Sequence, residues 1–412
     1  MEVYKVGGAV RDSLLGRAVK DRDWVVVGAT AAELESAGYR QTGKDFPVFL
    51  HPETHEEYAL ARTERKTGPG YKGFEVSASA DVTLEEDLRR RDLTINALAE
   101  NSTGDIIDPF GGRRDLELGI LRHISPAFIE DPLRVLRVAR FAARFNFKVA
   151  PETMELMTEI SASGELETLV AERIWGEWDR SLVEPRPRLF VEVLHECGAL
   201  ARLAPELAKL FGVPQPEKYH PEIDTGLHIL LVLDRVAELS KEGAVRFAAL
   251  FHDLGKGETP EEQWPSHRGH EERSVQLIER YCKRYKVPNY YRSLAVLVAR
   301  YHSHCHRAAE LRPATLLKVL EETDAFRRPP RFEQFLLACE ADARGRKGLE
   351  ERPYSQADVL RTARQVANAV SVKDLVGLTG EKIREHLRER RVQALTASSL
   401  NAAGNSQHPD RH

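Results

Sequence analysis

The sequence has few cysteines, and their spacing matches neither a disulfide framework nor a metal-binding motif. The four thiols are scattered, with no Cys-x-x-Cys pair among them: Cys197, Cys282, Cys305 and Cys339. This spacing excludes a disulfide framework and a Cys-x-x-Cys zinc site. We therefore expect reduced thiols and a cytoplasmic protein.

Long apolar runs and an excess of one charge are also absent. No run approaches the roughly 20 residues of a membrane-spanning helix, and the start MEVYKVGG has no signal-peptide pattern. Lys and Arg number 60 against 64 Asp and Glu, so any nucleic-acid surface must be a local patch. The 412 residues, 42% hydrophobic and 30% charged, are typical of a globular protein of two to four domains without membrane contact.

The beginning of the chain contains a phosphate-binding pattern. A short strand is expected before Gly7 and Gly8, and a helix over residues 9–15 after them, ended by Gly16. Two glycines allow positive φ and a close approach of a ligand. Free N–H groups at a helix start bind anions, and Arg11 can add a charge-assisted hydrogen bond to a phosphate. Gly8 and Arg11 are therefore predicted to bind a nucleotide.

A pair of carboxylates follows this pattern. Asp21 and Asp23 precede the apolar run 24–27, which is expected to be a buried strand. Because residues i and i+2 of a strand face the same side, the two carboxylates should lie together. Two carboxylates facing a phosphate site are ligands for Mg²⁺, so both are predicted to be catalytic and to bind this ion. A Gly-Gly or an Asp-x-Asp alone would mark only a turn or a solvated loop, but their ordered combination favours a catalytic site.

These motifs carry a resemblance to a known family. GGAVRD followed by DRD resembles the signature of the polymerase-beta-like nucleotidyltransferases. Over residues 1 to about 395 the chain is similar to the bacterial tRNA nucleotidyltransferases, the CCA-adding enzymes, and to the related poly(A) polymerases. The resemblance implies a third carboxylate on a neighbouring strand, and Glu57 matches it in the expected strand 57–62. A surface glutamate beside Glu56 explains Glu57 equally well.

The resemblance also assigns a basic segment. Arg91, in the expected helix 87–99, matches an RRD motif whose arginine contacts the nucleotide, and Asp92 and Asn96 share its neighbourhood. Residues 63–79 are rich in glycine, lysine and polar residues and are predicted to form a mobile loop. In the family, the equivalent segment closes in the switch from C to A addition.

A second arginine-rich helix is predicted over residues 129–145. Asp131 can cap it, with a proline at the first helical position. At about 100° per residue, Asp131, Arg134, Arg137 and Arg140 cover half of the helix, and apolar residues cover the other half. A carboxylate accepts and a guanidinium donates, so together they can read a Watson–Crick edge. An amphipathic helix with internal ion pairs is the alternative.

The resemblance gives this helix a role. EDPLR is similar to the family motif EDxxR, which selects CTP and ATP without a nucleic-acid template. It implies that Asp131 and Arg134 pair with the base, and that Arg137 and Arg140 hold nucleotide or phosphate.

The second half of the chain contains histidine motifs. His228 on one expected helix, and His252 with Asp253 in HDLGKG on another, resemble the HD metal-dependent phosphohydrolases. Imidazole and carboxylate ligands make a divalent-metal site that can act on a phosphoester. The resemblance implies one more aspartate, which Asp324 fits best and Asp342 next. His252 and Asp253 are predicted to be catalytic, and the ion to be a transition metal such as Ni²⁺.

Other residues of this half are less specific. Five further histidines are candidates for a substrate phosphate or a second metal: His267, His270, His302, His304 and His306. Residues 302–306 by themselves are expected to form a surface loop. Tyrosines interleave with basic residues between positions 281 and 301, which suits RNA binding, with a solvated surface as the alternative.

Together the motifs predict a multidomain α+β protein with a small mixed-sheet nucleotidyltransferase head and a mostly helical remainder. The expected parts are a head with the templating helix at its end (1–140), a helical neck (141–219), an HD phosphohydrolase domain (220–330), a helical tRNA-contacting region (331–397) and a disordered tail (398–412).

The resemblance implies addition of CCA to tRNA from CTP and ATP, by a monomer or homodimer. It also implies hydrolysis of 2′,3′-cyclic phosphates, 2′-nucleotides and phosphate esters for RNA end repair. A poly(A) polymerase with the same head is the nearest alternative. A phosphohydrolase with an inactive head and a silent RNA-binding protein are disfavoured by the intact DRD, EDPLR and HDLGKG motifs.

Overall fold

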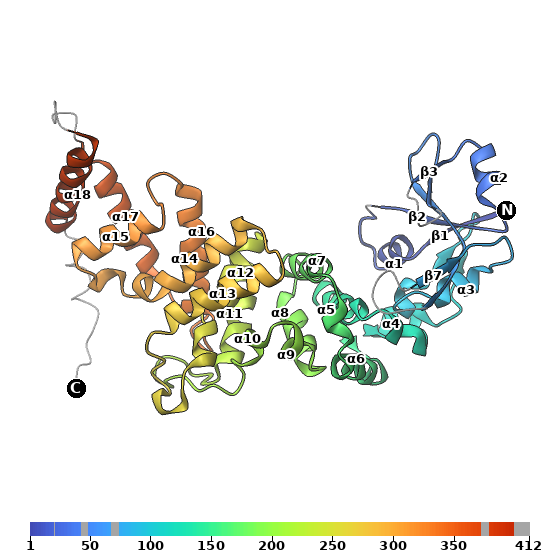
Figure 1. Ribbon diagram of the computed structural model, residues 1–412, viewed down its shortest axis with the longest axis horizontal. Helices are drawn as coiled ribbons and strands as arrows, with labels where there is room; N and C mark the ends of the chain where they lie inside the picture. Colours follow the sequence, from blue (N-terminus) through green and yellow to red (C-terminus); the bar gives the residue numbers. More distant parts are fainter. Residues whose placement is uncertain (20, 43–47, 67–73, 372–378, 399–412) are drawn as a thin grey trace. The chain divides into compact units, whose positions relative to one another are not determined.

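The computed structural model describes residues 1–19, 21–42, 48–66, 74–371 and 379–398. The chain divides into two compact units, Met1–Leu203 and Ala204–His412. Within the described residues, all strands belong to the first unit, and the second unit is helical (Figure 1).

The first unit is built on a seven-stranded mixed sheet with the order β3-β4-β5-β2-β1-β8-β9. Its strands are β1 (Glu2–Val6), β2 (Asp23–Val27), β3 (Arg40–Thr42), β4 (Val48–Leu50), β5 (Glu57–Leu60), β8 (Ala99–Glu100) and β9 (Ile106–Ile107). The central strand β2 is antiparallel to β1 and parallel to β5. Two small sheets pair β6 (Thr63–Lys66) with β7 (Phe74–Ser77), and β10 (Ile120–Leu121) with β11 (Lys148–Val149).

The alternation of side chains along β2 determines the face of the sheet on which Asp23, its first residue, lies. Successive side chains of a strand point to opposite faces of a sheet. Val25 and Val26 accordingly belong to two different buried clusters, one on each face. Asp23 is two residues before Val25 and so shares its face.

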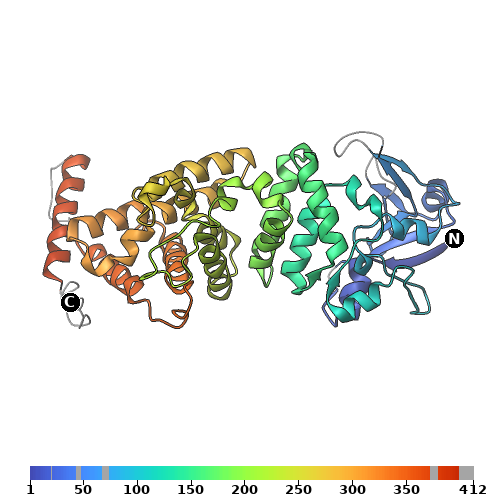
Figure 2. The same ribbon diagram turned by 90° about the horizontal axis from the view of Figure 1, so that it is seen from below.

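Nine α-helices are described in the first unit. They are α1 (Gly8–Leu14), α2 (Ala31–Ser36), α3 (Leu84–Arg89), α4 (Gly112–Leu118), α5 (Leu133–Phe145), α6 (Pro151–Ser163), α7 (Ala171–Leu182), α8 (Pro187–Glu196) and α9 (Ala199–Leu203). Short 3₁₀ turns are η1 (Thr94–Asn96), η2 (Pro126–Glu130) and η3 (Glu165–Thr168). The helix α5 packs against α7 and α8, and these green helices lie side by side in Figure 2.

Two sequence predictions for this unit are corrected. The helix expected over residues 87–99 ends at Arg89, and the chain continues through η1 into β8. The reason is burial, because Leu93, Ile95 and Leu98 are fully buried and the chain turns to bury all three. The loop expected over residues 63–79 has paired ends, β6 and β7, while residues 67–73 lie outside the described part.

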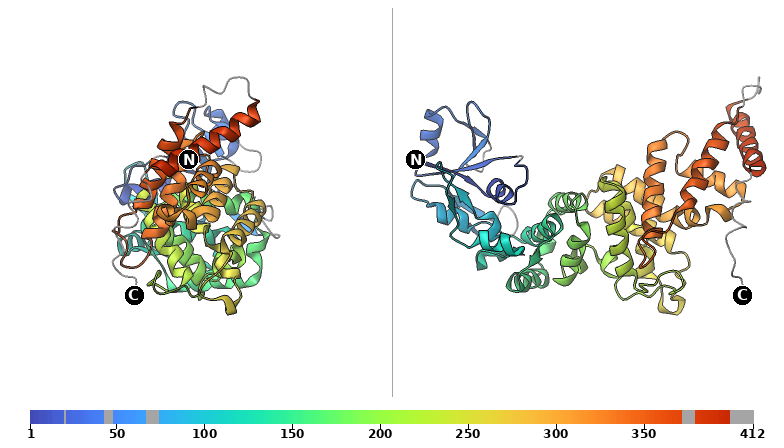
Figure 3. Two further views of the ribbon diagram at one scale, coloured as in Figure 1. Left: turned by 90° about the vertical axis from the view of Figure 1, so that its left-hand side faces the viewer. Right: turned by 180° about the vertical axis from the view of Figure 1, so that it is seen from behind.

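The described part of the second unit consists of helices and 3₁₀ turns. They are α10 (Pro205–Ala208), α11 (Thr225–Leu239), α12 (Gly243–Phe251), η4 (Leu254–Glu258), η5 (Glu261–Gln263), α13 (His270–Arg284), α14 (Asn289–His306), η6 (Ala308–Glu310), α15 (Pro313–Glu322), α16 (Pro329–Arg344), α17 (Ser355–Asn368) and α18 (Gly380–Ala397). The helices α12 and α16 each pack against α11, α14 and one another (Figure 3, right). None of the described helices has the length and apolar character needed to cross a membrane.

Most of the tyrosines between positions 281 and 301 lie in the core of this unit or are partly buried. Tyr281, Tyr285 and Tyr301 are buried, whereas Tyr290 is about half exposed. The expectation that this series faces RNA is therefore wrong for the three buried rings.

Candidate active sites

A cavity of about 400 Å³ lies in the first unit beside α1 and α5. We call it the arginine cavity, because seven of its lining side chains are guanidiniums. Its lining consists of Gly7, Gly8, Arg11, Asp23, Arg90, Arg91, Asp92, Asn96, Arg134, Arg137, Arg140, Phe141 and Arg144. The surplus of positive charge suits a ligand with several phosphates.

The glycine turn at the edge of this cavity depends on Gly7. Its φ is +67°, and a Cβ there would lie 2.6 Å from Nη1 of Arg91. The positive φ favours glycine, and a side chain there would also displace the guanidinium of Arg91. A Cβ at Gly8 would only touch Arg11, at an ordinary 3.5 Å. The turn thus brings the backbone close to Arg91, one of the predicted nucleotide-binding residues.

A buried carboxylate, Asp92, fixes two of the cavity's cationic side chains. It accepts hydrogen bonds from Nε of Arg137 and Nδ2 of Asn96, both at 2.8 Å. Asn96 in turn accepts one from Arg11. Burial acts to raise the pKa of Asp92, but Arg137 and the hydrogen bond from Asn96 lower it to about 2. Asp92 therefore stays ionised and holds Arg137 directly and Arg11 through Asn96.

The three predicted acids of the head are not equally placed. Asp23 opens β2 and stands opposite Glu57 of β5 in the parallel register. Neighbouring strands are about 4.8 Å apart, so the side chains of opposed residues lie close together on one face. Asp21 precedes β2, and the strand alternation used to pair it with Asp23 does not extend to it. All three are exposed, and Asp23 alone of them lines the arginine cavity.

The arginines of α5 face the cavity but are held by protein groups. Arg134 donates to the carbonyl oxygens of Ala127 and Arg90, both at 2.8 Å. Arg140 is buried, and its Nε donates to Glu177 of α7 at 2.6 Å. These contacts orient both guanidiniums, and Nη1 of Arg140 also lies 4.0 Å from Oε1 of Glu184. Arg134 keeps further N–H groups for a ligand.

The predicted start of α5 is nearly correct. The helix begins at Leu133, whose N–H donates to Oδ1 of Asp131 at 3.1 Å. The other oxygen of Asp131 lies 3.5 Å from Nη2 of Arg173. Asp131 is not among the residues that line the cavity.

The buried pair Arg140–Glu177 gives a stability prediction. Glu177→Ala removes the closest acidic partner of the buried Arg140 guanidinium and leaves the weaker contact with Glu184, whose Oε1 is 4.0 Å from Nη1. The loss should therefore be about 3 kcal/mol of unfolding free energy, the lower end of the range for a broken buried pair. Urea denaturation followed by far-ultraviolet circular dichroism measures the loss. Arg140→Met together with Glu177→Leu removes both charges and should recover most of it. A double variant as unstable as Glu177→Ala would contradict this account.

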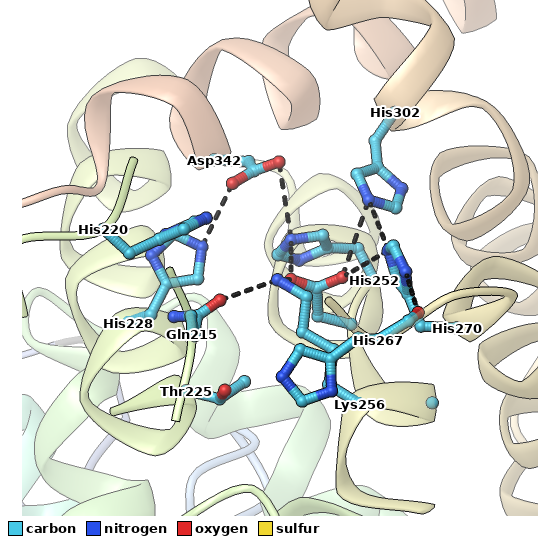
Figure 4. A network of polar contacts seen from close by, with 12 residues as sticks. Gln215, His220, Thr225, His228, His252, Lys256, His267, His270, His302 and Asp342 are labelled. Carbon is cyan, nitrogen blue, oxygen red and sulfur yellow. Dashed lines mark hydrogen bonds and ion pairs between the residues drawn. The ribbon is translucent and has the colours of Figure 1, made fainter. Parts of the chain in front are cut away.

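The second unit brings imidazoles and carboxylates together (Figure 4). His228 comes from α11, His252 and Asp253 directly follow α12, and Asp342 comes from α16. We call these four the histidine cluster; all four are buried. Nε2 of His252 is 3.2 Å from Oδ2 of Asp253 and 3.5 Å from Oδ2 of Asp342. Nε2 of His228 is 3.1 Å from Oδ1 of Asp342.

The electrostatics of the histidine cluster fit a cation. Burial acts to lower the pKa of His252, but Asp253 and Asp342 raise it to about 10. Its Nδ1 donates to the carbonyl oxygen of Ala249 at 2.7 Å, so Nε2 is the atom that faces the carboxylates. Nε2 of His252 and Oδ1 of Asp253 are buried without a hydrogen bond. Imidazole nitrogens and carboxylate oxygens are ligands of divalent transition metals, so these residues fit such an ion.

Comparisons with known proteins agree with this geometry. Residues 3–122 match the family model of the poly A polymerase head domain. Residues 146–211 match the "probable RNA and SrmB- binding site of polymerase A", and residues 225–329 match the HD domain. The multifunctional CCA protein of Nitrosococcus oceani is 65% identical over 397 residues, which cover 96% of this chain and 98% of that protein.

The chain belongs to the multifunctional CCA protein family. A further member, from Vibrio vulnificus, is 58% identical, over 98% of this chain and all of that protein. As a family member the chain is an enzyme with a nucleotidyltransferase head and the HD domain of metal-dependent hydrolases. Both domains imply divalent metals.

Solved structures confirm the predicted fold class. The Thermotoga maritima CCA-adding enzyme complexed with tRNA has a TM-score of 0.65 at 21% identity, covering 99% of this chain and 92% of that one. The Bacillus stearothermophilus CCA-adding enzyme in complex with CTP has a TM-score of 0.62 at 22% identity, covering 97% and 89%. At these identities the likeness concerns the fold: a mixed-sheet head and a largely helical remainder.

One predicted metal ligand of this family member is corrected. Asp324 is not in the histidine cluster. It follows α15 with φ +56° and pairs with Arg327 at 2.7 Å and Arg328 at 3.3 Å. Asp342, the second choice from the sequence, takes the place among the histidines. It lies on the face of α16 that packs against α11 and α12, together with buried neighbours such as Cys339.

The histidines after position 300 are also corrected. Residues 302–306 are not a surface loop but the last turns of α14. His302 is only 4% exposed and lies in the same interior as the histidine cluster. Nε2 of His306 donates to Oδ2 of Asp342 at 2.6 Å, and its Nδ1 is 2.9 Å from Oη of Tyr354. Sequence reasoning missed Tyr354; the 3.6-residue period of α14 was the available signal for His302.

Proposed function

We propose that this enzyme adds CCA to the 3′ end of tRNA, using CTP and ATP without a nucleic-acid template. The observation that carries the proposal is the arginine cavity with Asp23 at its edge, in a chain 65% identical to a multifunctional CCA protein. The cavity offers guanidiniums for a triphosphate, and Asp23 and Glu57 are opposed on neighbouring strands beside it.

The predicted residues of the head have distinct roles in this proposal. Asp21 and Asp23 hold Mg²⁺, with Glu57 as the third carboxylate. A bound Mg²⁺ neutralises phosphate charge and helps to align the reacting groups. Gly8 lets the backbone approach the nucleotide, and Arg11 and Arg91 bind its phosphates. Arg137 and Arg140 hold nucleotide or phosphate from α5, in positions set by Asp92 and Glu177.

Sequencing of the 3′ ends made on defined tRNA transcripts tests the proposal. A transcript lacking CCA should gain C residues with CTP alone, and CCA with both nucleotides. A homopolymer of A made with ATP alone would identify a poly(A) polymerase instead.

Base choice is assigned to Asp131 and Arg134. Substitution of both residues is expected to abolish the enzyme's preference for CTP and ATP over UTP and GTP. Each lost contact is worth roughly 1–3 kcal/mol, because a wrong partner leaves polar groups unpaired. Asp131 also accepts the Leu133 N–H, so Asp131→Asn with Arg134→Ala is the suitable variant, since the amide keeps an accepting oxygen. Competition among the four nucleotides on one transcript measures the preference.

The control for base choice is Arg173→Ala. It removes the ion pair of Asp131 without touching the proposed base contact. This variant should keep the preference for CTP and ATP. A folded Asp131→Asn, Arg134→Ala enzyme that still adds only CCA would place selection elsewhere, with Arg137 and Arg140 as the next candidates.

We further propose that the HD domain hydrolyses phosphoesters at RNA ends, among them 2′,3′-cyclic phosphates, 2′-nucleotides and phosphate monoesters. His228, His252, Asp253 and Asp342 would hold a transition metal such as Ni²⁺, which would supply Lewis-acid polarisation of the phosphoester. Asp253 and Asp342 of these four line a cavity of about 250 Å³, together with Lys256 and Arg346. These two cations suit a substrate phosphate.

A further inference from the structure

Tyr219 lies at the edge of the cavity of the second unit, and the proposed hydrolysis gives its ring no role. The residue is 56% exposed, and it lines the cavity of about 250 Å³ together with Lys256 and Arg346. In the described part of the second unit, Tyr219 is the one large, exposed apolar residue that lines this cavity. The position of its ring therefore asks for an explanation in terms of a ligand.

The ring is carried by a short loop, residues 215–223, which is closed by a backbone hydrogen bond. The N–H of Gln215 donates to the carbonyl oxygen of Ile223 at 2.8 Å. Inside the loop, the N–H groups of Tyr219 and His220 both donate to the carbonyl oxygen of Pro216 at 3.0 Å. His220 is buried, so the side chain after Tyr219 packs inward while Tyr219 itself stays at the surface.

The two cations that suit a substrate phosphate also hold this loop. Nζ of Lys256 donates to Oε1 of Gln215 at 2.7 Å (Figure 4). Nη1 of Arg346 donates to the carbonyl oxygen of Tyr219 at 3.2 Å. Nη2 of Arg346 lies 3.6 Å from Oδ1 of Asp342, a residue of the histidine cluster. The place of Tyr219 is thereby set relative to the groups that would bind the phosphate.

The size of the cavity determines which part of a nucleotide it can enclose. Pockets that bury most of a small-molecule ligand measure about 300–1,000 Å³. This cavity, at about 250 Å³, is below that range. A nucleotide whose phosphate lies beside Lys256 and Arg346 would therefore have its base at the edge of the cavity, where Tyr219 lies.

A phenol ring at this edge suits a base of any kind. Every base has a π-face, so stacking on an aromatic side chain does not require a particular sequence. Nζ of Lys218 lies 5.6 Å from the centre of the Tyr219 ring. One face of the ring thus has a cation over it, and a base would stack on the other.

We propose that Tyr219 stacks on the base of the nucleotide whose phosphate the HD domain hydrolyses. Lys256 and Arg346 bind the phosphate and Tyr219 binds the base, so nucleotides and RNA ends are better substrates than phosphoesters without a base. The inference rests on the proposed phosphohydrolase function, and it names the substrate class of that site.

Hydrolysis of two cyclic phosphates by the full chain with Ni²⁺ tests this role. Cytidine 2′,3′-cyclic phosphate carries a base, whereas glycerol 1,2-cyclic phosphate has the same five-membered phosphate ring without one. Tyr219→Leu removes the aromatic ring but keeps a large apolar side chain. It should raise KM for the cytidine substrate by roughly tenfold, within the range expected for the loss of one stacked base, and leave kcat unchanged. KM for the glycerol substrate should not change.

Two further variants separate stacking from other effects. Tyr219→Phe keeps the ring and should have the KM values of the wild type. Tyr290→Leu is the matched control, because Tyr290 is exposed to a similar degree, 52%, but does not line this cavity. It should also act as the wild type does. An unchanged KM for the cytidine substrate in Tyr219→Leu, or an equal rise for both substrates, would overturn the proposal.

Binding of a product measures stacking without hydrolysis. Cytidine 2′-monophosphate is titrated into the wild type and into Tyr219→Leu, with diamagnetic Zn²⁺ in place of Ni²⁺, and its base protons are followed by nuclear magnetic resonance. The ring current of Tyr219 should shift these protons upfield in the wild type and not in the variant. Nucleotide held by the head contributes equally to both proteins.

The product titration also distinguishes the failure of this inference from that of the proposed hydrolysis. Equal shifts in the wild type and Tyr219→Leu would overturn the stacking, whatever the enzyme hydrolyses. A wild type that shows the larger shift but hydrolyses neither ester would keep the base-binding role of Tyr219 and refute the hydrolytic function.

Discussion

Asp23→Ala is expected to lower the rate of nucleotide addition by roughly a thousandfold and to leave phosphoester hydrolysis unchanged. A metal ion contributes several kcal/mol of transition-state stabilisation, and each 1.36 kcal/mol is a factor of ten. Asp23 lines the arginine cavity at the end of β2, where it can hold such an ion beside the triphosphate. Asp21→Ala is expected to act in the same direction. Single-turnover addition of labelled CMP to a tRNA transcript measures the effect.

A matched pair of glutamates controls this experiment. Glu57 stands opposite Asp23, whereas the side chain of Glu56 accepts a hydrogen bond from Nε1 of Trp24 at 2.9 Å. Glu57→Gln should therefore slow addition and Glu56→Gln should not. Normal CCA addition by Asp23→Ala would remove the assignment of the metal site, and equal effects of the two glutamine variants would remove that of Glu57.

His252→Ala is expected to abolish hydrolysis of a 2′,3′-cyclic phosphate, by at least about a hundredfold, and to leave CCA addition intact. Asp342→Ala should do the same, because its two carboxylate oxygens lie beside His228 and His252. The loss of one ligand removes much of the several kcal/mol that a metal supplies. Release of the opened phosphate, measured across a series of divalent metals, gives the rate.

Asp324→Ala tests which aspartate is the last metal ligand of the HD domain, Asp342 as the structure indicates or Asp324 as the sequence predicted. Within the described part of the chain, the ion pairs of Asp324 are with Arg327 and Arg328, so its removal should leave hydrolysis within about twofold. Loss of hydrolysis in Asp324→Ala together with normal hydrolysis in Asp342→Ala would restore the original prediction. A wild type that hydrolyses no phosphoester with any metal would make the HD domain a scaffold.

Local patterns in the sequence predicted those parts of the molecule that local physics determines. The turn at Gly7 and the apolar run of β2 depend on nearby residues, and both are confirmed. The amphipathic period of α5 likewise placed Arg134 and Arg137 on the face that lines the cavity. The mixed-sheet head and the helical remainder followed from these elements.

The errors concern residues whose role depends on packing between distant segments. Asp342 reaches the histidine cluster because α16 packs against α11 and α12, and no spacing along the chain records that contact. The expected helix after Arg89 failed because Leu93 and Ile95 are buried by a turn rather than by a helix. The sequence placed Asp92 near Arg91, but its hydrogen bond with Arg137 of α5 depends on packing that no local pattern records.

The hydrogen bonds of Asp92 have a consequence for how the head recognises its nucleotide. Arg137 is held by Asp92, Arg11 by Asn96, and Arg140 by Glu177. When a ligand immobilises long side chains, each one lowers the binding free energy gained by about 0.5–1.5 kcal/mol. In this cavity that ordering takes place when the chain folds. An incoming triphosphate therefore meets a preorganised surface, so little of its binding energy is lost to freezing arginines and more remains to discriminate between bases.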